Sequence, residues 1–430
     1  MKKRVAFQTL GCKLNFSETS YIAGKFDTTL FDIVSHKAVA DYYIINSCLV
    51  TATAEKKCRT AIRQAKHRNP DAKVAVIGCM SQLQVEKLAL MKEVDIVLGT
   101  ANKFDIQKVL ANIPDTKENK CLAIVPELTK HTDFNASYSF GDRTRSFLKI
   151  QDGCDNFCSY CTVPYARGRS RSGTITEIVA LANETAAKGF KEIVLTGVNA
   201  GDFGKHHGTS LIQLLKSLTP VDGIERIRLS SIEPDLLNDE IIQWVASQKK
   251  MMPHFHLPLQ NGSDAILNAM NRKYSTAFFR EQVKKIKETI PDACIACDVI
   301  IGFPGETDDH FNETLSFLEA LPISYIHSFT YSGRPGTHAF SIYPKISNII
   351  KKERSIRIHH LSEKKKKEFY TQCAGQLRPV LFECDNNNGI ISGFTDNYIR
   401  VKTTYDSESC NKIKSVLLST IDTDGIFIAK

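Results

Sequence analysis

The strongest constraint on the fold is an alternation of short apolar runs with helix-length segments, which occurs twice along the chain. In the first series the apolar runs are of strand type and read VAFQTLG, YYIINSC, KVAVIGC and VDIVLGT. Helical patterns lie between them, at 17–26, 53–68 and 84–91. Strands that alternate with helices predict a parallel sheet with helices on its faces.

The second series begins at Arg145 and contains the runs SFLKIQDG, EIVLTGV, RIRLSS, HFHLPLQ, ACDVIIGF and YIHSFTYS. Helix-length segments separate these runs, which predicts a β/α barrel, complete or partial. A helical stretch at 346–370 follows, and the chain then switches to turns and short strands typical of a small all-β barrel.

We therefore predict a mixed α/β chain with an N-terminal parallel-sheet domain at 1–114 and a linker at 115–140, where the periodicity is lost. A central barrel domain at 141–370 and an all-β domain at 371–430 complete it. A chain of 430 residues is too long for one ordinary core, which agrees with several domains.

Composition and the chain start favour a cytoplasmic protein. The sequence has no run of 18 apolar residues, so no membrane span is expected. The start, MKKRVAFQTLG, lacks the apolar stretch of a signal peptide and resembles a first strand. Because the cytosol keeps thiols reduced, the 13 cysteines are not expected to form disulfides. The net charge of +9 permits a polyanionic partner without requiring one.

Three cysteines of the first series share one position. Cys12, Cys48 and Cys79 each stand at or just after the carboxyl end of a predicted strand. In a parallel sheet these ends lie along one edge, where open α/β folds bind ligands. The pattern favours a converging ligand cluster, and three buried, inert thiols are the alternative. We expect the remaining cysteines outside the motif below to be structural: Cys58, Cys121, Cys294, Cys297, Cys373, Cys384 and Cys410.

A second set of cysteines follows the pattern Cx3Cx2C directly after SFLKIQDG, in the stretch DGCDNFCSYC. A structural zinc site needs four protein ligands, but Cys154, Cys158 and Cys161 offer three, with no histidine nearby. A [4Fe–4S] cluster held by three thiolates leaves one iron open. The spacing resembles the signature of the radical S-adenosylmethionine superfamily. That resemblance implies that the open iron binds S-adenosylmethionine, whose reductive cleavage gives a 5′-deoxyadenosyl radical.

Other segments resemble the cofactor contacts of that superfamily. Tyr160 corresponds to the aromatic residue near the adenine, and Gly197 and Asn199 to the approach to the amino group. The same resemblance places Ser231 and Glu233 near the ribose, and Ile300 on the strand that lines the adenine. Taken singly, each segment is equally typical of a barrel strand with a polar end.

Essentially the whole chain resembles the methylthiotransferases. The matching stretches are TLGCKLN, INSCLVTATAEKKCR, VIGCM, DGCDNFCSYCTVPYARGRSRS, HFHLPLQNGSDAILNAMNRKYS, DVIIGFPGET and GFTDNYIRV, the last similar to a TRAM domain. The resemblance implies two [4Fe–4S] clusters, one on each cysteine set. An aromatic C–H bond has no acidic proton, so a radical must remove the hydrogen and a second site must present the sulfur.

Within this family, TLGCKLN and YARGRSRS resemble the branch that modifies carbon 2 of N6-threonylcarbamoyladenosine at position 37 of tRNA. The implied partners are a tRNA anticodon stem-loop, a flavodoxin- or ferredoxin-type electron donor and a sulfur donor. Three alternatives stay open: the same chemistry on isopentenyladenosine tRNA, the same chemistry on an aspartate of a ribosomal protein, and a non-catalytic iron–sulfur protein that binds RNA.

Basic and aromatic residues are the candidates for substrate contact. Arg167, Arg169 and Arg171 alternate, so in an extended segment they would point the same way. Guanidinium groups match phosphate and carboxylate, and we expect one of the three to recognise the threonylcarbamoyl carboxylate. A solvated basic turn is the alternative. In the last domain Phe394 and Tyr398 could stack on bases, with Arg400 beside them.

Overall fold

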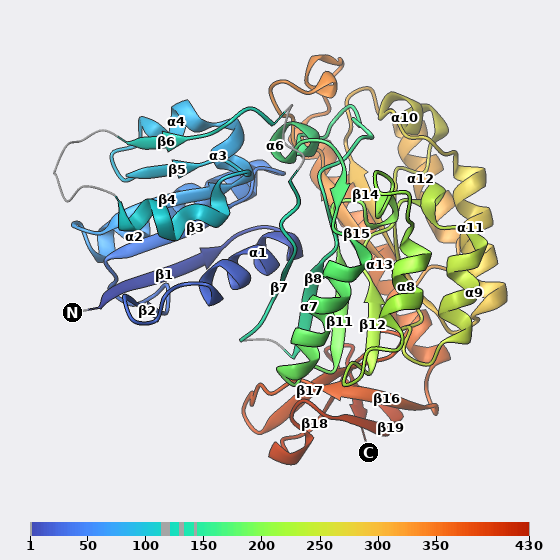
Figure 1. Cartoon of the computed structure of the whole chain (residues 1–430). Helices are drawn as coiled ribbons and strands as arrows, with labels where there is room; N and C mark the ends of the chain where they lie inside the picture. Colours follow the sequence, from blue (N-terminus) through green and yellow to red (C-terminus); the bar gives the residue numbers. More distant parts are fainter. Residues whose placement is uncertain (1, 113–120, 129–132, 142–143, 430) are drawn as a thin grey trace.

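The computed structural model describes residues 2–112, 121–128, 133–141 and 144–429. Three units follow one another along the chain: an N-terminal sheet domain, a partial barrel beside it, and a small closed barrel at one end of the partial barrel (Figure 1). The predicted fold class is confirmed, while the exact domain boundaries stay predictions.

The N-terminal sheet has six parallel strands in the order β2-β1-β3-β4-β5-β6. The strands are β1 (Lys3–Thr9), β2 (Phe31–Val34), β3 (Tyr42–Ser47), β4 (Lys73–Gly78), β5 (Ile96–Leu98) and β6 (Leu122–Ile124). The helices are α1 (Lys13–Gly24), α2 (Ala52–Arg68), α3 (Cys79–Leu83), α4 (Val85–Ala89), η1 (Lys103–Asp105) and α5 (Ile106–Ala111). All four predicted strands are confirmed. The helix predicted at 84–91 is confirmed as the shorter α4, and Gln84 separates it from α3.

The segment predicted as a linker, 115–140, contains two short strands. β6 pairs with β5, and β7 (Ser137–Tyr138) pairs antiparallel with β8 (Arg145–Lys149). The prediction is wrong for these two strands, because three and two residues are too few to display an alternating pattern. Its positions 115–120 and 129–132 lie outside the described residues.

The central domain is a partial barrel made of two parallel sheets. Parallel bridges from Ile227 to Met251 and from Ser231 to His256 join them. The first sheet contains β8, β11 (Glu192–Thr196) and β12 (Arg226–Leu229), and the second contains β13 (His254–Gln260), β14 (Cys294–Ile301) and β15 (Tyr325–Thr330). All six predicted runs are therefore strands.

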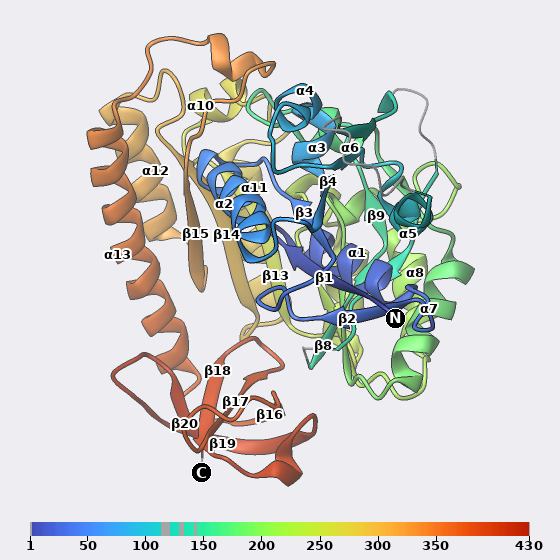
Figure 2. The same cartoon turned by 90° about the vertical axis from the view of Figure 1, so that its left-hand side faces the viewer.

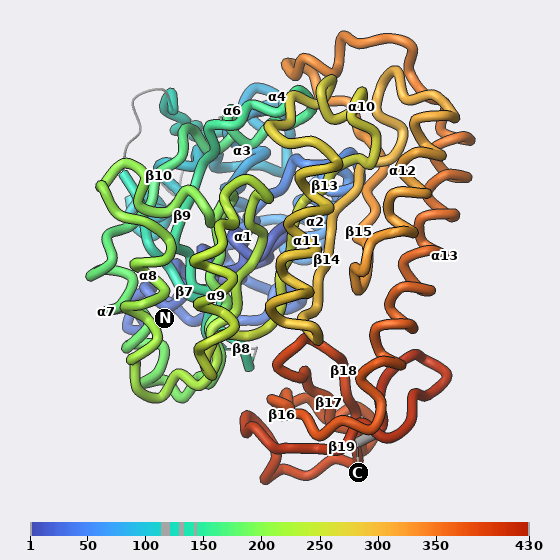
Figure 3. Tube along the Cα trace, turned by 90° about the vertical axis from the view of Figure 1, so that its right-hand side faces the viewer, coloured from blue at the N-terminus to red at the C-terminus, as the bar shows by residue number. Residues whose placement is uncertain are grey.

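Helices cover the outer face of this partial barrel (Figures 1 and 3). They are α7 (Ile175–Ala187), α8 (Leu211–Leu218), α9 (Asp239–Ser247), α10 (Asp264–Ala269), α11 (Thr276–Thr289) and α12 (Asp308–Ala320). The loops add β9 (Gln151–Asp152), α6 (Val163–Arg167), β10 (Arg171–Ser172), η3 (Ala200–Asp202), η4 (Pro234–Leu236) and η5 (His338–Ser341). Side-chain caps from Thr174, Asn238, Ser275 and Thr307 begin α7, α9, α11 and α12.

The long helix α13 (Asn348–Gln372) runs beside β15 to the closed C-terminal barrel (Figure 2). That barrel consists of β16 (Leu377–Phe382), β17 (Ile390–Thr395), β18 (Arg400–Thr404), β19 (Ile413–Ile421) and β20 (Phe427–Ala429), with η6 (Ser407–Ser409) before β19. Phe369 and Tyr370 of α13 pack into the barrel core with Phe382 and Phe427. The helix is thus anchored in the small domain.

The prediction that no cysteines are paired is wrong at one place. Cys384 and Cys410 form a disulfide. Leu381 of β16 pairs antiparallel with Ile413 of β19. Cys384 comes three residues after Leu381 and Cys410 three residues before Ile413, so the antiparallel register places the two cysteines opposite each other. A pairing between strands distant in the sequence brought these two thiols together. Among the described residues, no helix is long and apolar enough to cross a membrane.

Candidate functional site

The first cysteine set lies along one edge of the N-terminal sheet. Cys12, Cys48 and Cys79 follow the carboxyl ends of β1, β3 and β4, which are adjacent parallel strands. Cys48 and Cys79 are buried, whereas Cys12 is exposed. The structure therefore brings these three thiols to a common edge, as expected, and their role as ligands stays a prediction.

Close backbone contacts shape this edge. Gly11 has a φ of +102°, and a Cβ there would lie 2.9 Å from Cys48 Sγ, so only glycine fits. The side-chain amide of Asn15 donates to the carbonyls of Leu10 (2.9 Å) and Ser47 (3.1 Å). These two bonds tie the ends of β1 and β3 together just before their cysteines.

The chemistry of this first set fits a metal cluster. Burial raises the pKa of Cys48 to about 12, and it also raises the pKa of Cys79, which the nearby Arg167 opposes. Within the described part of the chain, the one trio of ligating side chains whose donor atoms all lie within 4.8 Å is His256, Asp298 and His327. The three thiols are thus not gathered around one small ion. A cluster of several irons holds its thiolates further apart and supplies the positive charge that deprotonates them.

The second cysteine set occupies the loop between β9 and α6, and each sulfur accepts one hydrogen bond. The backbone N–H of Asn156 donates to Cys154 Sγ (3.5 Å), and that of Val163 to Cys161 Sγ (3.4 Å). Arg272 Nη1 donates to Cys158 Sγ (3.1 Å). Hydrogen bonds to sulfur stabilise thiolates and tune clusters, so this loop fits a three-thiolate [4Fe–4S] site.

Arg272 was not predicted as a site residue. Its guanidinium also forms an ion pair with Glu233, one of the predicted cofactor residues, and so connects that carboxylate to Cys158. Burial raises the pKa of Glu233, although Arg272 opposes the shift. The arginine lies in a quoted motif, NRKYS, but no local pattern distinguishes it from a surface cation.

The other predicted cofactor residues fall into an apolar and a polar group. Tyr160 and Ile300 each pack against a cluster that contains Phe303. Asn199 is buried, and neither polar atom of its side chain has a hydrogen-bond partner in the described structure. Such orphaned polar atoms are rare in folded proteins and fit a bound ligand.

Two further predicted residues lie close to this region. A Cβ at Gly197 would stand 2.9 Å from Gln151 Oε1, so a larger residue there would displace the Gln151 side chain. Ser231 bridges to His256, where the two sheets of the partial barrel meet. Both positions therefore lie where strands end or join inside the barrel.

The three arginines do not point the same way, which corrects the prediction. Helix α6 ends at Arg167, and Gly168, with a φ of +81°, then turns the chain. Arg167 and Arg171 are buried and both bind Asp152, at 2.9 Å and 3.3 Å. The Arg169 side chain is 68% exposed and lies over the ring of Phe157. Only Arg169 thus remains accessible to a substrate.

Arg167 belongs to a buried ionic network that connects the two domains. Glu18 of α1 is fully buried and contacts Lys103 (2.6 Å), Lys149 (2.7 Å) and Arg167 (3.1 Å). Burial raises the pKa of Glu18, but these three cations outweigh it and hold that pKa below its ordinary value. The network contains more cations than carboxylates, and its Arg167 lies close enough to Cys12 and Cys79 to interact with their charges. This excess of positive charge suits an anionic cluster.

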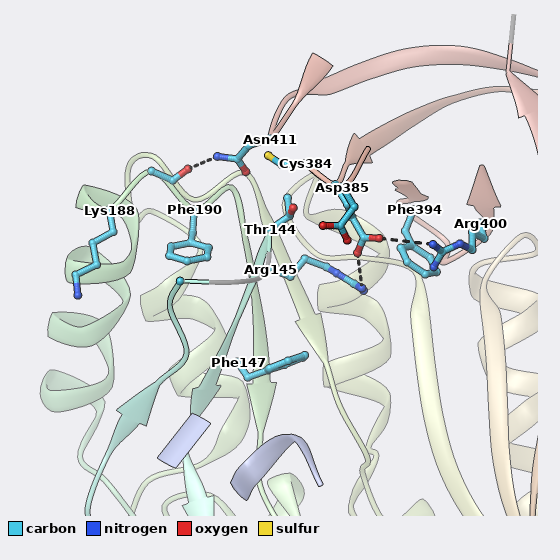
Figure 4. A pocket seen from close by; sticks show the side chains of 13 residues that line it. Thr144, Arg145, Phe147, Lys188, Phe190, Cys384, Asp385, Phe394, Arg400 and Asn411 are labelled. Carbon is cyan, nitrogen blue, oxygen red and sulfur yellow. Dashed lines mark hydrogen bonds and ion pairs between the residues drawn. The ribbon is translucent and has the colours of Figure 1, made fainter. Parts of the chain in front are cut away.

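Phe394 and Arg400 of the C-terminal barrel line a cavity of about 800 Å³ (Figure 4). Phe394 stacks on Tyr398 with ring centroids 4.8 Å apart, and Arg145 lies 4.5 Å from the Phe394 centroid. Glu383 forms ion pairs with Arg145 and Arg400, at 3.2 Å and 3.9 Å. The structure therefore brings the three predicted residues Phe394, Tyr398 and Arg400 together, where they border the barrel strand β8.

Comparisons with known proteins match both cysteine-bearing domains. The family model described as "Radical SAM superfamily" matches residues 148–318, and that described as "Uncharacterized protein family UPF0004" matches residues 4–99. The threonylcarbamoyladenosine tRNA methylthiotransferase MtaB of Aquifex aeolicus is 41% identical over 93% of this chain and 96% of that relative. The chain belongs to the methylthiotransferase family of radical SAM enzymes. Membership in this superfamily implies a [4Fe–4S] cluster and S-adenosylmethionine.

Two other relatives show the breadth of the methylthiotransferases. MtaB of Bacillus subtilis is 36% identical over 96% of this chain and 93% of its own length. The tRNA-2-methylthio-N(6)-dimethylallyladenosine synthase of Acetivibrio thermocellus is 33% identical over 98% and 90%. The solved structure of the radical S-adenosylmethionine methyltransferase TsrM from Kitasatospora setae matches 91% of this chain and 81% of its own, with a TM-score of 0.55. At 14% sequence identity, this match shows a shared fold alone.

Proposed function

We propose that this enzyme transfers a methylthio group to carbon 2 of N6-threonylcarbamoyladenosine at position 37 of tRNA. The observation that carries the proposal is the near full-length similarity to relatives named for that substrate, at 41% and 36% identity. A relative named for dimethylallyladenosine, at 33% identity, makes that nucleoside the second candidate.

The two cysteine sets would divide the chemistry. Cys154, Cys158 and Cys161 would hold the cluster that binds S-adenosylmethionine, and Cys12, Cys48 and Cys79 a second cluster that presents the sulfur. One S-adenosylmethionine would donate the methyl group and another the radical that removes the hydrogen. The residues proposed to contact this cofactor are Tyr160, Gly197, Asn199, Ser231, Glu233 and Ile300.

The protein's own side chains would bind and orient the cofactor and the RNA. Asn199 offers an unpartnered amide, and the Tyr160–Ile300 wall offers an apolar surface for an adenine. Arg272 would hold both Cys158 and Glu233 in place. Exposed Arg169 would contact RNA, together with Phe394, Tyr398 and Arg400 of the C-terminal barrel, whereas Arg167 and Arg171 are already engaged inside the protein.

The proposal includes partners and a location. The anticodon stem-loop of tRNA is the macromolecular substrate, a flavodoxin- or ferredoxin-type protein is the reductant, and a separate donor supplies sulfur. We place the enzyme in the cytoplasm, where its tRNA substrate is available.

Nucleoside mass spectrometry after anaerobic turnover tests this function. The reconstituted enzyme is supplied with S-adenosylmethionine, reductant, sulfide and two tRNAs, one bearing threonylcarbamoyladenosine and one isopentenyladenosine. We expect a methylthio gain on the first tRNA alone. Gain on the second alone would keep the reaction and overturn the substrate, and deoxyadenosine release without product on either would indicate a protein substrate.

A further inference from the structure

One cation beside the first cysteine set lacks a carboxylate partner. Lys13 begins helix α1 directly after Cys12, and its side chain is exposed. No ion pair within 4.0 Å joins Lys13 to a described carboxylate, and its ammonium instead lies 5.9 Å from the ring centroid of Phe147. Phe147 lines the cavity of about 800 Å³ in Figure 4. Lys13 therefore stands where the N-terminal domain faces the barrel.

The surroundings of Lys13 come from several elements. Arg145 of β8, Arg228 of β12, Asp298 of β14 and Tyr398 of the C-terminal barrel all act electrostatically on its ammonium group. The side chain is exposed, and its contact with Phe147 places it where the N-terminal domain faces the barrel domain.

The carboxylates beside these groups are already engaged. Glu383 pairs with Arg145 at 3.2 Å, and Glu192 pairs with Arg228 at 2.8 Å. Asp298 accepts hydrogen bonds from His256 at 2.8 Å and from His327 at 3.3 Å. Lys13 therefore has no carboxylate partner among the described residues and stays available for an incoming anion.

The position of Lys13 on its helix is locally unfavourable. The amino-terminal end of a helix carries partial positive charge, so a lysine in the first turn is repelled by it. The first turn of α1 contains no acidic residue that would compensate. A residue that breaks a local rule without a structural gain is expected at functional sites.

We propose that Lys13 binds the carboxylate of the N6-threonylcarbamoyl group and thereby selects an adenosine with an anionic N6 substituent; this inference rests on the proposed function. On a purine, carbon 2 and the N6 amino group flank N1 on the same edge. A substrate whose carbon 2 faces the sulfur-presenting cysteines therefore brings its N6 substituent to the same side. Lys13, next to Cys12, is placed to receive that substituent's carboxylate.

The test compares the binding of matched anticodon stem-loop RNAs to the cluster-loaded enzyme, by fluorescence anisotropy without oxygen. One RNA carries N6-threonylcarbamoyladenosine and the other its neutral methyl ester. We expect the wild type to bind the acid roughly tenfold to a hundredfold more tightly, as for a hydrogen bond to a charged group. Lys13→Gln should abolish this ratio, and Lys13→Arg should retain it.

Lys25→Gln serves as the matched control. Lys25 lies at the other end of α1, is exposed and also rests on an aromatic ring, that of Tyr21. Its replacement should leave the acid-to-ester ratio unchanged. Because both RNAs are measured on the same protein, a partial loss of iron in a variant changes both affinities and not their ratio.

Two results would overturn the inference: a wild type that binds acid and ester equally, or a Lys13→Gln variant that keeps the wild-type ratio. Turnover of the wild type separates this failure from that of the proposed function. If the wild type adds a methylthio group to the threonylcarbamoyladenosine RNA while Lys13→Gln keeps the wild-type acid-to-ester affinity ratio, the proposed function stands and Lys13 is not the carboxylate site. If no methylthio group is gained, the proposed function itself fails.

Discussion

Replacing Glu18 by glutamine tests how the two cysteine-bearing domains are held together. The Glu18 carboxylate is fully buried and contacts Lys103 at 2.6 Å, Lys149 at 2.7 Å and Arg167 at 3.1 Å. Lys149 and Arg167 belong to the barrel domain. Glutamine preserves the shape of the side chain but removes its charge, which leaves these buried cations undercompensated.

Removing one partner of a buried ion pair costs about 3–5 kcal/mol, because an uncompensated charge stays behind. A surface pair of similar geometry provides the control. Lys216 and Glu240 are 2.7 Å apart, with side chains 46% and 56% exposed, and exposed pairs contribute about 0.2–1 kcal/mol. We therefore expect Glu18→Gln to lower the free energy of unfolding several-fold more than Glu240→Gln does.

The assay is anaerobic urea unfolding followed by circular dichroism, with hydrogen exchange at α1 and β8 to locate the change. Because the neighbouring cations hold the pKa of Glu18 below its ordinary value, despite burial, its contribution is complete at neutral pH. It is lost as the pH falls through the lowered pKa, so wild type and variant should converge in acid. Equal losses in the two variants, within about 1 kcal/mol, would refute the argument from burial.

Three further outcomes are expected. Cys154→Ala should lose about half of the bound iron, since one of the two proposed clusters would be removed. Cys58→Ser should retain the iron, because among its described hydrogen bonds the Cys58 thiol bonds only the backbone of Cys48; iron analysis of the purified proteins measures both outcomes. Burial raises the pKa of Asp298, but hydrogen bonds from its two histidines lower it to about 2. In cluster-free protein, Asp298→Asn should therefore remove a stabilisation of about 2 kcal/mol that is present above pH 4 and is lost towards pH 2; urea titrations across that range would contradict this if both proteins lost stability in parallel. Arg169→Gln should leave the melting temperature unchanged and reduce the salt dependence of tRNA binding by about one counterion, and an unchanged slope would exclude a phosphate contact.

Local patterns in the sequence predicted the strands and the positions of the cysteines, because both depend on short-range order. Each of Cys12, Cys48 and Cys79 follows an apolar run of strand type, and a parallel sheet aligns the ends of such runs. The arginine prediction was wrong although a signal existed. Pro164 near the start of α6 and Gly168 after its end are the ordinary limits of a short helix. A helix ending at Arg167 removes it from any extended segment.

The contacts between domains could not be predicted in this way. Glu18 lies 131 residues from Lys149 and 149 from Arg167, and no periodicity connects such positions. The disulfide between Cys384 and Cys410 depends on the register of β16 against β19 and was hidden for the same reason. Edge strands such as β6 are too short to show a pattern of their own.

The segment from Cys161 to Arg167 connects the two cysteine sets through buried polar contacts. Helix α6 begins two residues after Cys161, and the carbonyl of Ala166 accepts a hydrogen bond from Thr100 Oγ1 in the N-terminal domain (2.7 Å). Arg167 then bonds Asn15, whose amide holds the backbone just before Cys12 and Cys48. Apolar replacements of similar volume can match such a network in stability, so stability alone does not explain it. Fully satisfied polar networks specify one arrangement. The reaction we propose, in which one site removes a hydrogen and another delivers sulfur to the same carbon, requires a fixed spacing between the two sites, and this network would provide it.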